Sequence, residues 1–262
     1  MISLQEQIKS RKGDNESIRM DIKLYYREQG TGKSMILLHG NGENSGYFEH
    51  QITYFSEKYR VIAIDTRGHG MSERGDKPFT IGQFAEDLHD FMDQHQIEKA
   101  IILGFSDGGN IALKFAVKYG KRVEALIVDG ANLDPGGVKI SEQLPVEFEY
   151  RLARFSVRKT PESRKKAELL GLMVNDPFIK TSDLQKIIVP TLVLAGTKDM
   201  IKEKHTRFIA ENILDAKLAL IPGTHFIARD NSGEFNAAVD KFLNSLKDQE
   251  GKRTKCKIIK GR

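Results

Sequence analysis

The chain has 262 residues, of which 39% are hydrophobic and 29% are charged, and its formal net charge is +5. This length allows one large α/β domain or two smaller ones, with enough apolar residues for a packed core. The single cysteine, Cys256, excludes an intrachain disulfide and is typical of a reducing compartment. No run approaches the roughly 18 apolar residues of a membrane span, and residues 1–17 lack the apolar core of a signal peptide. We therefore expect a cytoplasmic protein without a membrane span.

The positive charge is concentrated at the C-terminus. Residues 247–262 contain seven lysines or arginines against Asp248 and Glu250, which gives +5 and leaves residues 1–246 net neutral. The charge therefore does not indicate nucleic-acid binding by the body of the chain, and we expect no nucleic-acid partner. We predict that residues 248–262 form a basic, disordered tail.

Predicted strands and helices alternate along the first half of the chain. We expect strands at 17–20, 22–27, 35–38, 60–64, 99–105 and 125–128, and helices at about 45–57, 80–92 and 108–119. The second helix has a clear start, because Thr80 and Gln83 match a capping box and Phe79 and Phe84 match the hydrophobic staple around it.

Residues 132–186 lack any buried strand and contain charged, amphipathic patterns. We predict helices at about 141–157 and 161–174, the second with Thr160 as N-cap and Pro161 as its first residue. Strands at 191–195 and 217–221 and helices at about 202–212 and 233–246 then resume the alternation. The sequence therefore predicts an α/β core formed by residues 1–131 and 187–247, with a mostly parallel sheet flanked by helices. We expect residues 132–186 to form a helical cap inserted into that core.

The most informative stretch is Gly104-Phe105-Ser106-Asp107-Gly108, which has the Gly-x-Ser-x-Gly spacing of a nucleophile elbow. An apolar, β-branched run precedes it and an apolar helical run follows it. The glycines have a steric reason, because strand and helix pass close on both sides of a strained serine.

Further polar features follow the other predicted strands, at 39–44, at 65–72, at Asp199 and at His225. The carboxyl ends of parallel strands meet at one edge of a sheet, where ligands bind. A serine hydroxyl needs a base to become a nucleophile, and the base needs an orienting group. We expect Ser106 as nucleophile, His225 as base and Asp199 as orienting acid; Asp129, which also ends a strand, is the alternative acid.

An oxyanion hole requires two fixed N–H donors. We expect these donors to be the backbone N–H groups of Asp107, which follows the nucleophile, and of Asn41, in the glycine-rich loop after an early strand. His39 and His69 lie in glycine-rich loops and are expected to brace them by hydrogen bonds. No histidine or cysteine spacing indicates a metal site.

Several motifs together resemble the α/β-hydrolase superfamily over residues 20–246. They are His39-Gly40-Asn41-Gly42, Asp65-x-Arg67-Gly68-x-Gly70-x-Ser72, Gly104-x-Ser106-x-Gly108-Gly109, Pro190-x-x-x-x-Ala195-Gly196-x-x-Asp199 and Gly223-x-His225. The resemblance implies an eight-stranded sheet, a helical cap, the triad Ser106, Asp199 and His225, and oxyanion donors at Asn41 and Asp107.

The elbow also looks like that of biphenyl-hydrolase-like enzymes, which cleave amino-acid esters. In those enzymes the acid after the serine helps to receive a cationic amino group, a role that remains open for the Asp107 carboxylate. Fold alone does not determine the substrate. We expect a cofactor-free serine hydrolase acting on a small-molecule ester, with Phe148, Tyr150, Phe155 and Met173 of the cap around the substrate. Hydrolysis of a carbon–carbon bond or perhydrolysis by the same triad, and a non-catalytic binding module of the same fold, are the alternatives; the oligomeric state stays open.

Overall fold

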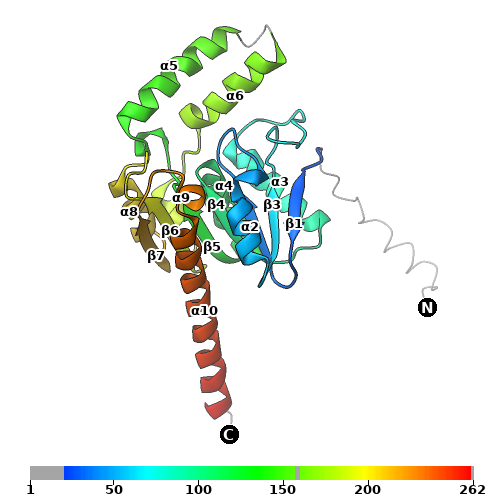
Figure 1. Cartoon of the computed structure of the whole chain (residues 1–262), viewed down its shortest axis with the longest axis vertical. Coiled ribbons are helices and arrows are strands. Elements are labelled where there is room, and N and C mark those ends of the chain that lie inside the picture. The colour runs from blue at the N-terminus through cyan, green and yellow to red at the C-terminus, as the bar shows by residue number, and fades with distance from the viewer. Residues whose placement is uncertain (1–20, 157–159, 261–262) are drawn as a thin grey trace, which may run out of the picture.

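The computed structural model describes residues 21–156 and 160–260, and these form a sheet with helices packed on both faces (Figure 1). The sheet has seven strands in the order β1-β3-β2-β4-β5-β6-β7; β1 is antiparallel to β3, and every other pair is parallel. The strands are β1 (Tyr26–Gln29), β2 (Ser34–Leu38), β3 (Arg60–Ile64), β4 (Ala100–Phe105), β5 (Val123–Asp129), β6 (Thr191–Gly196) and β7 (Ala216–Ile221).

The strand order reverses between β2 and β4. From β2 the chain first adds β3 on one side and then crosses to add β4 on the other side. Such a switch point leaves a crevice beyond the carboxyl ends of the two strands, because the connections on either side lead away from each other. The loops after β2 and β4 therefore meet at the position where ligands bind in folds of this kind.

Helices cover the two faces of the sheet and bury two separate apolar clusters. On one face lie α3 (Ile81–Gln94), α4 (Asp107–Tyr119), α7 (Thr181–Leu184) and α8 (Glu203–Glu211). On the other face lie the 3₁₀ helix η1 (Ser45–Phe48), α2 (Glu49–Phe55), α9 (Ile227–Asp230) and the start of α10 (Ser232–Lys260). Short 3₁₀ turns η2 (Gly120–Arg122) and η3 (Pro135–Gly137) complete the connections.

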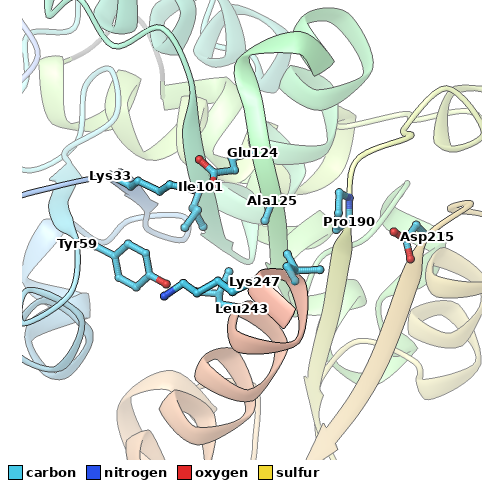
Figure 2. Close-up of a pocket in the computed structure, with 10 residues that line it drawn as sticks. Lys33, Tyr59, Ile101, Glu124, Ala125, Pro190, Asp215, Leu243 and Lys247 are labelled. Carbon is cyan, nitrogen blue, oxygen red and sulfur yellow. Dashed lines mark hydrogen bonds and ion pairs between the residues drawn. The ribbon is translucent and has the colours of Figure 1, made fainter. Parts of the chain in front are cut away.

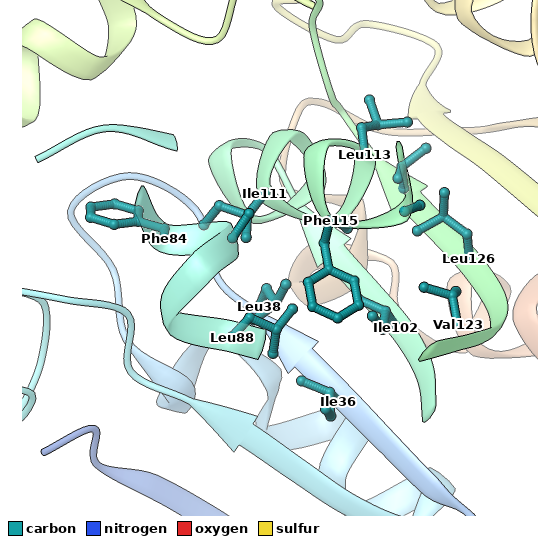
Figure 3. Packing of buried hydrophobic residues seen from close by; sticks show 14 of the residues in the cluster. Ile36, Leu38, Phe84, Leu88, Ile102, Ile111, Leu113, Phe115, Val123 and Leu126 are labelled. Atoms are coloured by element: carbon teal, nitrogen blue, oxygen red, sulfur yellow. The ribbon is translucent and has the colours of Figure 1, made fainter. Parts of the chain in front are cut away.

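The apolar runs of the central strands are continuous because both faces are covered. In β2, Ile36 and Leu38 enter one cluster, whereas Met35 and Leu37 enter the other. Figure 3 shows the first cluster, in which Phe115 of α4 packs among side chains of the strands. Burying each such side chain contributes on the order of 1.5–3 kcal/mol, so α4 is held firmly against the sheet.

The predicted cap contains α5 (Ile140–Ser156) and α6 (Pro161–Asn175), which form a helical hairpin that projects from the sheet (Figure 1). The predicted start of α6 is confirmed, because Thr160 Oγ1 accepts a hydrogen bond from Ser163 N–H at 3.1 Å. At the start of α3, Thr80 acts as N-cap and accepts a hydrogen bond from the Gln83 N–H. The Gln83 side chain, however, donates to Asp87 and so does not complete the capping box. The assignment of residues 132–186 to a separate cap domain stays a prediction.

Three sequence-based expectations differ from the structure. The prediction of eight strands is wrong for the described residues, which contain seven; the expected strand at 17–20 lies outside them. The expected strand at 22–27 is instead β1 at Tyr26–Gln29, a sheet edge that pairs only with β3 and has weak apolar alternation. The last helix continues to Lys260, through the segment predicted to be a disordered tail.

Within residues 21–156 and 160–260, no helix combines the length and the hydrophobicity that crossing a membrane requires.

Two helical glycines provide a matched test of the packing between α4 and the sheet. Gly108 and Gly233 are each the second residue of a helix, α4 and α10 respectively. A Cβ on Gly108 would lie 1.9 Å from the carbonyl oxygen of Leu38, whereas one on Gly233 would meet nothing within 4 Å. We expect Gly108→Ala to lower the free energy of unfolding by at least about 3 kcal/mol, and Gly233→Ala to raise it by up to about 1 kcal/mol. Urea titration measures both, and equal stabilities for the two variants would contradict the proposed close packing.

Candidate active site

Ser106 lies at the turn between β4 and α4 with an unusual backbone conformation. Its φ and ψ angles are 53° and −119°, in a region that non-glycine residues rarely occupy. A Cβ on Gly104 would lie 2.1 Å from the carbonyl oxygen of Gly108, so the strand and the helix can approach only with glycine there. The strained turn projects the serine side chain beyond the end of β4, which is the geometry of a nucleophile elbow.

His225 connects Ser106 to Asp199. Its Nε2 atom lies 3.0 Å from Ser106 Oγ, and its Nδ1 atom lies 2.7 Å from Asp199 Oδ1. A carboxylate can only accept, so His225 Nδ1–H donates to Asp199 and Nε2 is left to accept the serine proton. The backbone N–H groups of Ile201 and Gly196 donate to Asp199 and fix its orientation. The three side chains follow β4, β6 and β7, and the chemistry that they can perform is general-base activation of a hydroxyl.

The alternative acid, Asp129, has a different environment. It is fully buried at the end of β5, and neither of its carboxylate oxygens has a partner among the described residues. Burial, and then the charge of Asp199, raises the pKa of Asp129 well above its usual value, so its neutral form is favoured. A neutral carboxyl group cannot stabilise an imidazolium, and no hydrogen bond joins Asp129 to His225 in the described chain.

The loop after β2 approaches the elbow closely. A Cβ on Gly40 would lie 3.2 Å from Ser106 Cβ, so glycine at this position lets the loop backbone pass beside the nucleophile. His39 braces the loop: its Nδ1–H donates to Gly40 O at 2.7 Å, and its Nε2 accepts from Thr66 N–H at 3.0 Å. Within the described chain, no hydrogen bond uses the backbone N–H of Asn41 or of Asp107. Both groups are thus available to an oxygen bound near Ser106.

The Asp107 side chain belongs to a polar network that sequence reasoning did not predict. Asn41 Nδ2 donates to Asp107 Oδ2 and to the carbonyl oxygen of Leu169, each at 2.9 Å, and Asn110 Nδ2 lies 3.2 Å from Asp107 Oδ1. Burial raises the pKa of Asp107 to about 6, although both amides oppose the shift. The network joins the loop after β2, the elbow and cap helix α6. The only sequence signal was Asn110 itself, an amide next to the apolar run Ile111-Ala112-Leu113 of α4.

The predicted substrate-binding residues of the cap make no hydrogen bond to the Asp107 and Asn41 side chains within the described chain. Tyr150 is half-buried and its hydroxyl accepts from Asn175 at 2.8 Å; Met173, also half-buried, lies on α6. Phe148 and Phe155 are exposed on α5. No hydrogen bond or ring contact between described residues joins any of the four to Ser106. Their assignment to a substrate pocket therefore stays a prediction that these contacts do not support.

Several cavities lie away from Ser106, and two of them adjoin α10 or the predicted cap helices. One, of about 130 Å³, is at the opposite edge of the sheet, between the first residues of the central strands and α10 (Figure 2). Another, of about 430 Å³, lies between the cap helices and the segment 74–80 and includes Tyr150 in its lining. Neither is lined by the Ser106, His225 and Asp199 group. No group of three histidine, cysteine or acidic side chains in the described part of the chain could hold a metal ion.

Comparisons with known proteins agree with this architecture. Residues 33–159 match the family model of the alpha/beta hydrolase fold. The 3-oxoadipate enol-lactonase 2 of Acinetobacter baylyi is 27% identical over 85% of this chain and 94% of its own length. The human serine hydrolase BPHL is 28% identical over 85% of this chain and 83% of its own length. The structure of a thermophilic esterase from Thermogutta terrifontis superposes with a TM-score of 0.73 at 24% identity, covering 86% of this chain and 94% of that one.

The fold, the matched family and the alignment of relatives over most of their length lead to one conclusion. The chain belongs to the α/β-hydrolase superfamily and is an enzyme, a hydrolase.

Proposed function

We propose that this hydrolase cleaves small carboxylic esters through an acyl-enzyme intermediate on Ser106. The observation that carries the proposal is the chain of hydrogen bonds from Ser106 through His225 to Asp199, at 3.0 and 2.7 Å, beside two unused backbone N–H groups. These are the parts that acyl transfer requires: a hydroxyl with its base, an oriented base, and donors for the developing oxyanion.

The proposed reaction proceeds in two halves. His225 Nε2 takes the Ser106 proton as Oγ attacks the acyl carbon, and Asp199 stabilises the imidazolium that forms. The N–H groups of Asn41 and Asp107 hold the oxyanion of the tetrahedral intermediate. The imidazolium then gives its proton to the leaving alcohol, and the acyl group remains on Ser106. Water, deprotonated by the same histidine, hydrolyses the acyl-enzyme and restores the serine.

The names of two compared proteins support an ester as the substrate class. One is named as an enol-lactonase, which acts on a cyclic ester, and another as an esterase. The acyl group, the alcohol and a cytoplasmic location for the reaction stay predictions. Hydrolysis of carbon–carbon bonds or perhydrolysis would use the same triad, and no contact in the cap favours either of them.

Replacing the nucleophile tests the covalent step. A fluorophosphonate probe is expected to label the wild-type chain, because it reacts with serines that an adjacent base activates. Ser106→Ala should abolish the labelling. It should also lower kcat toward p-nitrophenyl acetate by at least about 10³-fold. Circular dichroism serves as the control for folding. A wild-type chain that stays unlabelled, or labelling that survives in Ser106→Ala, would refute the assignment of Ser106.

A pair of isosteric substitutions distinguishes the two acids. Asp199→Asn is expected to lower kcat by about 10⁴-fold, because the imidazole loses the group that fixes its tautomer. Asp129→Asn should change kcat by less than about tenfold, since burial and the charge of Asp199 raise the pKa of Asp129 and no hydrogen bond between described residues joins it to His225. Steady-state kinetics on one ester measures both variants. The reverse order of effects would make Asp129 the catalytic acid.

The carboxylate of Asp107 is proposed to position the oxyanion loop rather than to receive an amino group. Both of its oxygens already accept hydrogen bonds from the side-chain amides of Asn41 and Asn110, which hold the loop after β2 and α4 together. In Asp107→Asn the new NH₂ group would face the NH₂ group of Asn41 or Asn110, so one hydrogen bond would be lost. We expect this loss to lower the rate on the order of tenfold. We expect kcat/KM to fall equally for alanine benzyl ester and for the corresponding propionate ester. A loss confined to the amino-acid ester would instead show that the carboxylate binds the substrate.

A further inference from the structure

Helix α5 carries a stripe of large apolar side chains that the rest of the described chain leaves exposed. Its members occur every three or four residues, so they share one face of the helix. With their exposed fractions, they are Ile140 (66%), Leu144 (59%), Phe148 (64%), Leu152 (53%) and Phe155 (85%). Soluble proteins rarely expose a contiguous apolar surface of this kind, and such patches mark interaction sites.

The apolar stripe points away from the proposed active site. The opposite side of α5 packs on α6, where Gln143 Nε2 lies 3.4 Å from Met173 O and Asn175 donates to Tyr150. Helix α6 in turn contacts the core, through Leu169 O to Asn41 and through Glu168 to Arg74. Helix α5 is therefore the outer helix of the predicted cap (Figure 1). Its apolar stripe lies on the side of α5 that faces away from α6 and is exposed.

The charges beside the stripe change sign along the helix. The first part of α5 carries Glu142, Glu147 and Glu149, and the last part carries Arg151 and Arg154. Glu149 pairs with Lys166 of α6 at 3.0 Å, but Glu142 and Arg151 form no ion pair within the described chain. A helix that is acidic in one half and basic in the other is complementary to its own antiparallel copy. An anionic lipid surface would attract only one half and repel the other.

We propose that the stripe on α5 is the docking surface for a second copy of this chain, in a two-fold symmetric dimer with the two α5 helices antiparallel. With the axis near Phe148, Leu144 packs opposite Leu152 of the second copy, and Arg151 lies beside Glu147 of the second copy. Each helix of 17 residues is about 25 Å long. One helix pair buries less than the roughly 1,600 Å² of a standard interface, so the dimer is concentration-dependent. This inference does not depend on the proposed function.

Sedimentation of the full chain across a wide concentration range tests the apolar part of the proposal. The wild-type protein is expected to pass from monomer to dimer as its concentration rises. Leu144→Glu and Leu152→Glu should each raise the dissociation constant at least about tenfold, because each places a charge in the apolar seam. Leu214→Glu is the matched control, since Leu214 is 81% exposed away from the cap, and it should sediment like the wild type. A wild-type protein that stays monomeric at every concentration would overturn the proposal.

Charge reversal tests the antiparallel register. Glu147→Arg and Arg151→Glu should each weaken the dimer at least about tenfold, because like charges then face each other. An equimolar mixture of the two variants should associate as tightly as the wild type, since every pair is again opposite in sign. Failure of the mixture to associate would refute the register. Flotation with phosphatidylserine vesicles provides the competing outcome: binding that Glu147→Arg strengthens, without any dimer, would identify a membrane surface and overturn the proposal.

Discussion

The architecture depends on how closely the first turn of α4 approaches the end of β2. The carbonyl oxygen of Leu38 occupies the space that a side chain at Gly108 would need, and Gly108 occupies the space that a side chain at Gly104 would need. This contact forces the chain through the strained turn at Ser106 and brings the loop after β2 beside it. The strain costs on the order of 1–3 kcal/mol, and the two apolar clusters on either side of the sheet are large enough to offset it. One steric constraint therefore positions both the proposed nucleophile and its proposed oxyanion donors.

Two carboxyl groups, Asp129 and Asp199, follow neighbouring strands but have different electrostatic environments. Asp199 accepts hydrogen bonds from the backbone N–H groups of Gly196 and Ile201 and from His225. Asp129 is buried without a hydrogen-bond partner among the described residues, and the charge of Asp199 further disfavours its ionisation. Only one negative charge is therefore favoured beneath the imidazole. The difference lies in the hydrogen bonds, because both side chains are almost completely buried.

Local patterns predicted those parts of the structure that local physics determines. The buried strands, the N-caps at Thr80 and Thr160 and the elbow glycines follow from short-range sterics and hydrogen bonding, and the sequence indicates them within a few residues. The convergence of Ser106, Asp199 and His225 was predictable because parallel strands end at one edge of a sheet. The link from Asp107 through Asn41 to Leu169 was not, since the Asn41 side chain joins partners that lie 66 and 128 residues away from it in the sequence. The single-turn helices α7 and α9 are too short for a hydrophobic periodicity to predict them. The apolar residues of α5 indicated a buried face, but they could not show which face the rest of the described chain would leave exposed.

The most direct test of the proposed chemistry is to trap the acyl-enzyme. The protein would be mixed with p-nitrophenyl acetate, quenched in acid within one turnover and analysed by mass spectrometry of the intact chain and its peptides. We predict one acetyl group per chain, located on Ser106, and none on Ser106→Ala. Hydrolysis of the ester without an acylated chain, or with the acyl group on another residue, would contradict a covalent mechanism at Ser106.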